Sequence, residues 1–289
     1  MASLKPYLQL TRPANLVTAV ADILAGMAIA GFLFAQSTPY WLLLATLGLY
    51  GGGVVLNDVF DAELDAIERP ERPIPSGQVP RRSAALLGWS LLLVGVLAAS
   101  LHSPLSAGLA LAVALLAVLY DRFAKHHRVL GPVVMGTCRG GNLLLGMSAV
   151  PESLGRWGWL ALVPIVYIGA ITLISQDEVH GGKRRTLYFA WVLYGLVHLV
   201  QLVVSFQKGN LLLALPLILA HAILVGRPLW RAVQNPVGPQ IGKAVKAGVL
   251  ALIVMNAAWC MVFGYGYLTL VVVLLLPLSI LLARIFAVT

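Results

Sequence analysis

Charged residues are scarce in this chain, and their scarcity excludes a water-soluble domain. Of its 289 residues only 11% are charged, whereas 60% are hydrophobic and the mean hydropathy is +0.89. A domain that folds in water does not have this composition, because too few polar side chains are present to cover its surface. The chain is therefore predicted to lie in a membrane.

Cysteine is also rare. The two cysteines, Cys138 and Cys260, fall inside predicted membrane spans and lack the spacing of metal ligands. We interpret both as small apolar packing residues.

Long apolar runs recur along the whole chain and predict nine or ten transmembrane helices. They cover residues 14–34, 40–56, 83–101, 104–120, 129–150, 157–175, 187–206, 210–226, 244–263 and 266–286. Each is about long enough to cross a ~30 Å hydrocarbon core as a helix, and in lipid the backbone must satisfy its own hydrogen bonds. The last two runs form either two helices joined near Gly264 and Gly266 or one broken span. The predicted fold is an all-α polytopic bundle in a single domain, residues 1–289.

Basic residues lie almost entirely on one side of the predicted membrane. Counting the gaps between spans, that side holds 17 of the 20 Lys and Arg residues, which leaves Arg156 and Lys208 opposite and Arg139 inside a span. Such an excess is typical of cytoplasmic loops. We therefore expect a multi-pass protein of the cell (inner) membrane with a cytoplasmic N-terminus. The basic residues behind the net charge of +9 are then explained by the orientation of the chain in the membrane. No nucleic-acid partner is therefore predicted.

Acidic residues number only 11, and eight of them lie in two short segments on the predicted cytoplasmic side. The first segment holds Asp58, Asp61, Glu63, Asp65, Glu68 and Glu71, and the second holds Asp177 and Glu178. If the second span continues as a helix past the bilayer, its 3.6-residue period places Asn57, Asp61 and Asp65 in one stripe, with Asp58 beside it.

Acids three and four residues apart on one helical face repel one another, so a positive group must lie among them. One interpretation is a solvated cluster that Arg69 and Arg72 neutralise. The other is a metal site, because oxygen ligands without His or Cys favour Mg²⁺, which completes its shell with water and substrate phosphate. In that case Arg69, Arg72 and Lys183 are candidates to hold the remaining phosphate oxygens.

Two short segments match at an offset of 120 residues and suggest two copies of one unit. The segment from Asp22 to Met27 matches the segment from Asn142 to Met147, and Asn57-Asp58 falls on Asp177-Glu178. The copies would be parallel repeats, about residues 8–125 and 126–240, each supplying one polar motif to a shared cavity. Coincidence is the alternative for so short a match.

The same offset places Asp22 and the pair of Arg139 and Asn142 at comparable depth inside two spans. Ionisable residues inside a membrane are costly and usually face a cavity or a partner. Two interpretations stay open for Arg139 and Asn142: contact with a substrate in the cavity, or a structural pairing with Asp22.

The segment from Asn57 to Gly77 resembles the first signature of the UbiA superfamily of intramembrane prenyltransferases. The sequence NDVFDAELD followed by RPERPIPSG is similar to the family's N-D-x-x-D-x-x-x-D followed by R-x-x-R-P-x-x-S-G. Further similarities are TRPANL at the start of the first span and GGKRRTL after the sixth. The resemblance extends over about residues 8–265.

This resemblance implies a helical bundle around a lipid-open cavity, in which Mg²⁺ bridges the acidic motifs to the diphosphate of an isoprenoid. The prenyl group then passes to an acceptor, commonly an aromatic ring. The candidate metal ligands are Asn57, Asp58, Asp61, Asp65, Asp177 and Glu178, and the catalytic candidates among them are Asp58, Asp61 and Asp177. The candidates for holding the diphosphate are Arg69, Arg72, Lys125 and Lys183.

Two departures from the family pattern are visible. Ile174 stands where many members carry the first acid of D-x-x-x-D, Glu178 stands at the second, and His180 follows as a further residue to test. After the fourth span, YDRFAKHH offers Tyr120 and Lys125 where the family often has Y-P or Y-S and then K-R. These departures resemble the divergent EboC-like branch of the superfamily.

The sequence therefore predicts a Mg²⁺-dependent prenyltransferase whose partners are an isoprenyl diphosphate, a small acceptor and membrane lipid. Because the second motif is incomplete, a UbiA-like lipid binder or transporter without turnover is the alternative. A phosphatidyltransferase also uses clustered aspartates, but its signature D-G-x-x-A-R does not occur in the sequence.

Overall fold

The computed structural model describes residues 4–32, 40–178 and 181–286, and these residues form helices joined by turns. In chain order the helices are α1 (Leu4–Leu10), α2 (Pro13–Ala30), α3 (Tyr40–Phe60), α4 (Ala62–Glu68), α5 (Arg81–His102), α6 (Pro104–Leu119), the π-helical turn η1 (Tyr120–Ala124), α7 (Leu130–Met147), α8 (Ser153–Trp157), the 3-10 turn η2 (Gly158–Ala161), α9 (Leu162–Ser175), α10 (Arg184–Gln207), α11 (Leu211–Gln234), α12 (Gly238–Val262) and α13 (Gly266–Ile285).

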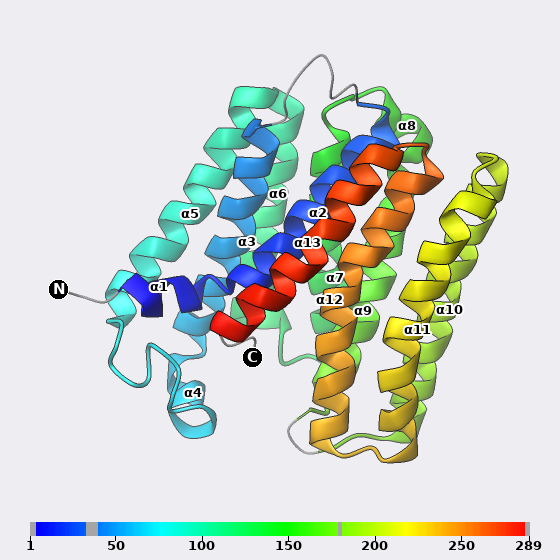
Figure 1. Cartoon of the computed structure of the whole chain (residues 1–289). Helices are drawn as coiled ribbons and strands as arrows, with labels where there is room; N and C mark the ends of the chain where they lie inside the picture. Colours follow the sequence, from blue (N-terminus) through cyan, green and yellow to red (C-terminus); the bar gives the residue numbers. More distant parts are fainter. Residues whose placement is uncertain (1–3, 33–39, 179–180, 287–289) are drawn as a thin grey trace.

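Nine helical segments of the described chain are long and apolar enough to cross a membrane, and each coincides with a predicted apolar run. One of them, Ser153–Ser175, joins α8, η2 and α9. Helix α7 runs through the bundle beside these segments (Figure 1), although Arg139 and Asn142 make it more polar. The predicted all-α polytopic fold is confirmed.

The C-terminal region consists of two separate helices. Helix α12 ends at Val262, α13 begins at Gly266, and Gly264 between them has a φ of +86°. Glycine adopts this left-handed conformation without steric cost, so the chain reverses there. Helix α13 then packs against α12 and α2 (Figure 1).

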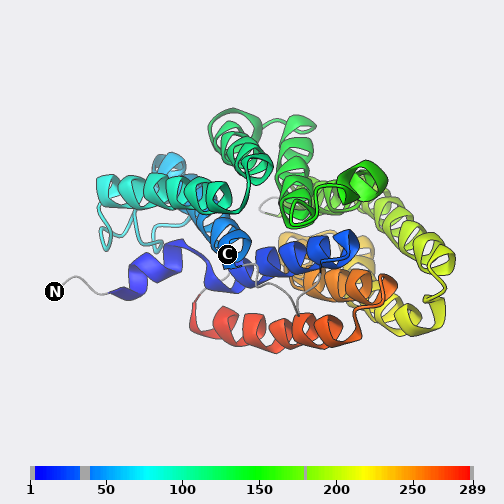
Figure 2. The ribbon, with the colours of Figure 1, turned by 90° about the horizontal axis from the view of Figure 1, so that it is seen from above.

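Helices α2 and α12 lie at the centre of the bundle, and the other long helices surround them (Figure 2). These two spans are the most deeply buried, whereas α5, α6, α10, α11 and α13 turn many large apolar side chains outward. In a membrane, an apolar outer surface of this kind faces lipid.

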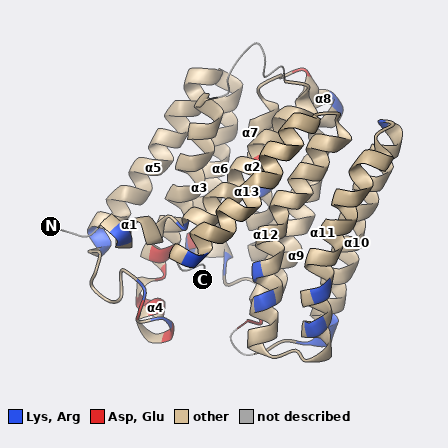
Figure 3. Cartoon of the chain, viewed as in Figure 1, with Lys and Arg blue, Asp and Glu red and all other residues tan. Residues whose placement is uncertain are grey.

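Charged side chains gather at the end of the bundle that carries α4 (Figure 3). Arg156 and Lys208, which the sequence places on the opposite side, lie there together with Glu152 around a pocket at the far end of the bundle. The distribution of charge between the two ends matches the prediction, and the assignment of one end to the cytoplasm stays a prediction.

The segments that match at an offset of 120 residues pack against each other, because they lie on α2 and α7. Asn142 Nδ2 donates a hydrogen bond of 3.2 Å to Asp22 Oδ2. A Cβ atom added at Gly26 would collide with the backbone oxygen of Leu143, and one added at Gly146 would collide with that of Ile23. The short match therefore marks a close helix contact of the type that small residues permit. The division into repeats 8–125 and 126–240 stays a prediction.

This close contact makes the stability of the bundle sensitive to one added methyl group. We expect Gly26→Ala to lower the free energy of unfolding by about 1–3 kcal/mol, because α2 and α7 must separate to accept it. The matched control is Gly195→Ala on α10, where a Cβ meets no atom within 4 Å. Thermal unfolding in detergent measures both, and equal stability of the two variants would contradict the packing.

Candidate functional site

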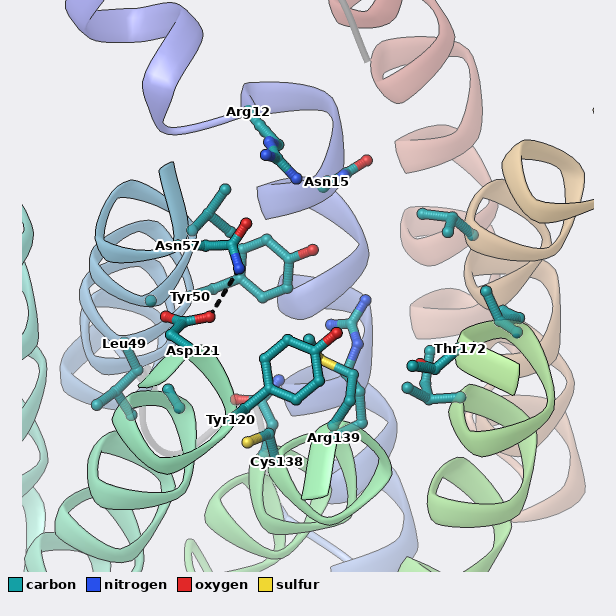
Figure 4. A pocket seen from close by; sticks show the side chains of 18 of the residues that line it. Arg12, Asn15, Leu49, Tyr50, Asn57, Tyr120, Asp121, Cys138, Arg139 and Thr172 are labelled. Atoms are coloured by element: carbon teal, nitrogen blue, oxygen red, sulfur yellow. Dashed lines mark hydrogen bonds between the residues drawn. The ribbon is translucent and has the colours of Figure 1, made fainter. Parts of the chain in front are cut away.

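A cavity of about 310 Å³ opens between α2, α3, α6, α7, α9 and α12, toward the end of the bundle that carries the charges. Most of its wall is apolar, with side chains such as Leu49, Val113 and Leu252. The polar side chains that line it are Arg12, Asn15, Tyr50, Asn57, Tyr120, Asp121, Arg139, Asn142, Thr172 and Ser175. Figure 4 shows that the labelled ones come from different sides of the cavity, with Thr172 opposite Tyr50 and Asn57. The cavity is therefore suited to an apolar ligand with one charged end.

The first acidic motif begins at the end of α3 and continues into α4. The sequence had indicated one continuous helix, but the chain turns at Asp61 and α3 and α4 are separate helices. The side chain of Asp61 pairs with Lys125 and does not cap α4. Backbone bonds from Asp61 to Asn57 and from Asp65 to Asp61 nevertheless keep a helix-like spacing. The predicted stripe of polar residues is thus preserved across the break.

Three cations hold the three aspartates of this motif. Arg12 lies 2.6 Å from Asp58 Oδ1, and Arg72 lies 3.4 Å from the same oxygen. Arg72 also lies 2.7 Å from Asp65 Oδ2. Together with the pair of Lys125 and Asp61, these contacts neutralise the acids.

The neutralising residues are only partly those that the sequence had suggested. Arg72 contributes, as expected, but Arg12 and Lys125 replace Arg69, which makes no ion pair with an acid in the described part of the chain. Asp58, Asp65 and Arg72 are nearly inaccessible to solvent. The arrangement is therefore a buried charge network, not a solvated surface cluster.

The donor chemistry of this motif fits a hard divalent cation. Asn57, Asp58, Asp61 and Asp65 offer only amide and carboxylate oxygens, the ligands that Mg²⁺ prefers. Among the described residues, however, no three Asp, Glu, His or Cys side chains are already gathered as a metal cage. Since Mg²⁺ usually takes only one or two carboxylates and completes its shell with substrate phosphate, the residues fit such a role.

The second motif follows α9 and does not line the cavity. Asp177 lies against Gly182, and Glu178 lies against Gly242 of α12. Burial raises the pKa of Glu178, and the charge of Arg69 partly opposes this rise. Ile174, at the position where an acid was missing, is fully buried in the apolar core. His180 lies outside the described residues.

Lys183, the other predicted diphosphate ligand, directly precedes α10 and is exposed. It forms no ion pair with any described acid. The structure therefore gathers Arg72 and Lys125 at the first motif. Arg69 follows α4 of the first motif, and its charge also acts on Glu178 of the second, whereas Lys183 lies five residues after Glu178 in the chain.

Arg139 and Asn142 lie deep in the cavity wall, and both bind Asp22. Arg139 Nη1 donates to Asp22 Oδ2 at 2.7 Å, and its other terminal nitrogen donates to Thr18. Asn256 of α12 donates to Asp22 Oδ1 at 2.7 Å. Asp22 thus has donors on both oxygens, which is a structural role. Arg139 and Asn142 combine this role with a place in the cavity lining.

Two residues of the site were missed from the sequence. Arg12 begins α2 with a φ of +46°, a left-handed conformation that costs a residue other than glycine about 1–2 kcal/mol. Its position before Pro13 was an available signal, since a following proline disfavours helical geometry. Asp121 is buried beside Asn57, whose Nδ2 donates to Asp121 Oδ1 at 2.8 Å (Figure 4). An acid at the end of an apolar span was its only signal.

Comparison with known proteins places this geometry in a family context. A model of the UbiA prenyltransferase family matches residues 19–241. The digeranylgeranylglyceryl phosphate synthase of Methanothrix thermoacetophila is 32% identical over 209 residues, which cover 69% of this chain and 78% of the relative. The protein of the same name from Methanospirillum hungatei is 29% identical, with 85% of this chain and 94% of the relative covered.

Solved structures share the fold. One, from a study of digeranylgeranylglyceryl phosphate synthase in membranes, is 24% identical with a TM-score of 0.65 and covers 90% of this chain and 98% of its own. A UbiA homolog from Archaeoglobus fulgidus, bound to GPP and Mg²⁺, is 14% identical with a TM-score of 0.66 and covers 88% of this chain and 99% of its own. These likenesses extend over nearly the whole bundle.

The buried pair of Asp22 and Arg139 yields a prediction about stability. Arg139→Met leaves the Asp22 carboxylate unpaired in an apolar interior, so we expect it to lower the free energy of unfolding by about 3 kcal/mol. Adding Asp22→Asn removes the orphaned charge and should restore part of the loss. Unfolding of both variants in detergent tests this, and a double variant less stable than Arg139→Met would contradict it.

The raised pKa of Glu178 yields a prediction about pH. Since its pKa is higher in the folded state than in the unfolded state, folding favours the protonated form, and its carboxylate destabilises the fold as pH rises. We therefore expect Glu178→Gln to gain stability relative to the parent protein as pH rises from about 4, the ordinary pKa of Glu. Melting temperatures at several pH values measure this, and a difference independent of pH would contradict it.

Proposed function

Because this chain belongs to the UbiA prenyltransferase family, we propose that it transfers a prenyl group from an isoprenyl diphosphate to a small acceptor, with Mg²⁺ as its cofactor. We place the reaction at the cytoplasmic face of the cell membrane, because the acidic motifs share their end of the bundle with most of the basic residues (Figure 3).

One observation carries the proposal. Three aspartates of the first motif meet Arg12, Arg72 and Lys125 beside an apolar cavity among membrane-spanning helices, and Arg12 and Asn57 connect this charge network to the cavity lining. Acids alone would suit a cation, and cations alone would suit an anion. Because acidic and basic side chains are paired here, the site suits a ligand that carries both a cation and an anion. A magnesium diphosphate is such a ligand.

The metal ligands proposed are Asn57, Asp58, Asp61 and Asp65, with Asp177 and Glu178 from the second motif. Their carboxylate and amide oxygens match the preference of Mg²⁺. When bound, the ion would neutralise the diphosphate and stabilise the charge that develops on the leaving group.

The cations have a separate task. Arg72 and Lys125, with Arg69 and Lys183, would bind the diphosphate oxygens, and Arg12 is an additional candidate at the cavity wall. Guanidinium groups form paired hydrogen bonds with phosphate oxygens, which fixes the orientation of the diphosphate. The prenyl chain then extends along the apolar lining.

The cavity wall protects the reaction from water. The C1–O bond of the prenyl diphosphate breaks, diphosphate leaves, and the acceptor atom bonds to C1 and loses its proton. Side chains such as Leu49, Val113 and Leu252 exclude water that would otherwise capture the cationic prenyl group.

A lipid binder or transporter of the same fold remains the second candidate. The observation that favours it is Ile174, which occupies the position of a motif acid and is fully buried in the core. Such a protein would bind the diphosphate but release none.

The proposal predicts the behaviour of Asp61→Ala. We expect this variant to fold but to lose Mg²⁺-dependent diphosphate release by a hundredfold or more (~10²), measured on mixing the protein with geranylgeranyl diphosphate and a cell extract as the source of acceptor. The matched control is Glu63→Ala, which removes an exposed acid two residues away that pairs with Arg81. Its activity should equal that of the parent protein.

Full activity of Asp61→Ala would reject the proposal. Binding of geranylgeranyl diphosphate without any release by the parent protein would instead support the lipid binder.

A further inference from the structure

Two cations at the far end of the bundle have no part in the reaction described so far. Arg156 and Lys208 stand apart from the basic residues that gather at the end carrying α4 (Figure 3). The tendency of basic residues to lie in cytoplasmic loops disfavours them here, so their position calls for a local role. Both line a pocket of about 390 Å³ together with Glu152 and with aromatic and apolar side chains.

The pocket is built by three segments that are far apart in the chain. Trp157 belongs to α8, Lys208 lies between α10 and α11, and Phe263 follows α12. The rings of Trp157 and Phe263 pack edge to face with their centroids 5.1 Å apart. Asn210 Nδ2 donates a hydrogen bond of 3.0 Å to the backbone oxygen of Val262. The pocket wall thus contains a packed aromatic pair, and the helix ends beside it are tied together.

Both cations lie against this aromatic pair. Lys208 Nζ is 4.5 Å from the centroid of each ring, and the guanidinium carbon of Arg156 is 5.3 Å from that of Trp157. A ring face attracts a cation, but it has no oxygen to accept the N–H groups. Within the part of the chain that the structure describes, neither side chain donates a hydrogen bond or forms an ion pair. Their N–H groups are therefore available to a ligand.

The two positive charges also act on each other. Burial lowers the pKa of Lys208, and the charge of Arg156 lowers it further. Among the described residues, Glu152 is the only acid that lines the pocket, and it is exposed and pairs with neither cation. An anion bound between the two cations would remove their repulsion.

Exposed aromatic side chains indicate the depth of the pocket in the membrane. Tyr40 and Trp41 begin α3, Trp159 lies in η2, and Tyr267 lies in the first turn of α13, and all four are exposed. These helix ends lie at the same end of the bundle as α8 (Figure 1). Since Trp and Tyr gather at the level of the lipid headgroups, the pocket lies where the phosphates of one leaflet are.

We propose that Arg156 and Lys208 bind the phosphate of an anionic phospholipid in the leaflet opposite the acidic motifs. The apolar residues of the pocket, such as Ile29 and Val150, contact the start of its hydrocarbon chains. This site is separate from the cavity between α2, α3 and α7, and the inference does not depend on prenyl transfer.

Charge and surroundings favour this ligand. Arg156 and Lys208 together with Glu152 give a net charge of +1 (two cations and one acid), which one phosphodiester compensates. Their N–H groups match phosphate oxygens, and basic pockets between transmembrane helices are suited to lipid headgroups. A zwitterionic headgroup would add a third cation. A dissolved anion would leave the apolar part of the pocket in water, whereas a lipid covers it.

Fluorescence of Trp157 tests the inference at the site itself. The protein is reconstituted in vesicles of phosphatidylcholine to which either phosphatidylglycerol or phosphatidylcholine, brominated near the headgroup end of its acyl chains, is added. The Trp157 signal is the difference between the parent protein and Trp157→Phe. We expect brominated phosphatidylglycerol to quench it at about tenfold lower content than brominated phosphatidylcholine, the worth of one charged interaction.

Variants at the two cations decide the result. The double variant Arg156→Gln/Lys208→Gln should quench equally with both lipids, and Arg156→Gln alone, at an exposed position, should lose part of the preference without disturbing the fold. Lys208→Arg keeps the charge and should keep the preference. Glu152→Gln should strengthen it, because a carboxylate that opposes the phosphate is removed.

The matched control removes the same charge at the other end of the bundle. Lys243 and Lys246 are exposed on α12, and Lys243→Gln/Lys246→Gln should leave the preference for phosphatidylglycerol unchanged. Addition of glycerol phosphate separates the two sources of a phosphate ester. It should not relieve the quenching, because it lacks hydrocarbon chains, and relief at equal concentration would overturn the lipid in favour of a soluble ligand.

Three results would overturn the proposed site. One is equal quenching of the parent protein by both lipids. Another is a preference that survives in Arg156→Gln/Lys208→Gln, and the third is a preference that the control variant on α12 loses to the same extent. Diphosphate release by these variants should equal that of the parent protein, so failure of the lipid site and failure of the prenyltransferase function are distinguishable.

Discussion

A charge that leaves water must be met by an opposite charge or by hydrogen bonds, and this constraint shapes the centre of the bundle. Asp22 receives donors from Arg139 and Asn142 on α7 and from Asn256 on α12. Asn142 in turn accepts a hydrogen bond from Thr46 on α3. One buried carboxylate thus links four helices, and one of them, α7, carries the cavity-lining residues Arg139 and Asn142.

The same constraint explains the candidate site. Arg12, Arg72 and Lys125 hold the aspartates of the first motif where Mg²⁺ and a diphosphate would exchange partners with them. The charges are therefore balanced in the protein itself and balanced again in the proposed complex. Among the acids that the structure describes, only Asp121 has a buried oxygen without a hydrogen-bond partner.

The sequence predicts the spans well, because the length of an apolar run is a local property that the bilayer itself sets. It also locates Asp58, Asp61 and Asp65, since their spacing is local. The pairing of Arg12 with Asp58, 46 residues apart, and of Asn57 with Asp121, 64 residues apart, depends on how helices pack. Periodicity likewise does not indicate that the helix is interrupted at Asp61, or that the Asp61 side chain pairs with Lys125 from a different helix.

We propose above all that the acids and cations beside the cavity jointly bind a magnesium diphosphate. Equilibrium binding of geranylgeranyl diphosphate to the purified protein, measured with Mg²⁺ and with a chelator, tests it most directly. The account predicts that Mg²⁺ tightens binding and that Asp58→Asn weakens this effect. Equal affinity with and without the metal would contradict it.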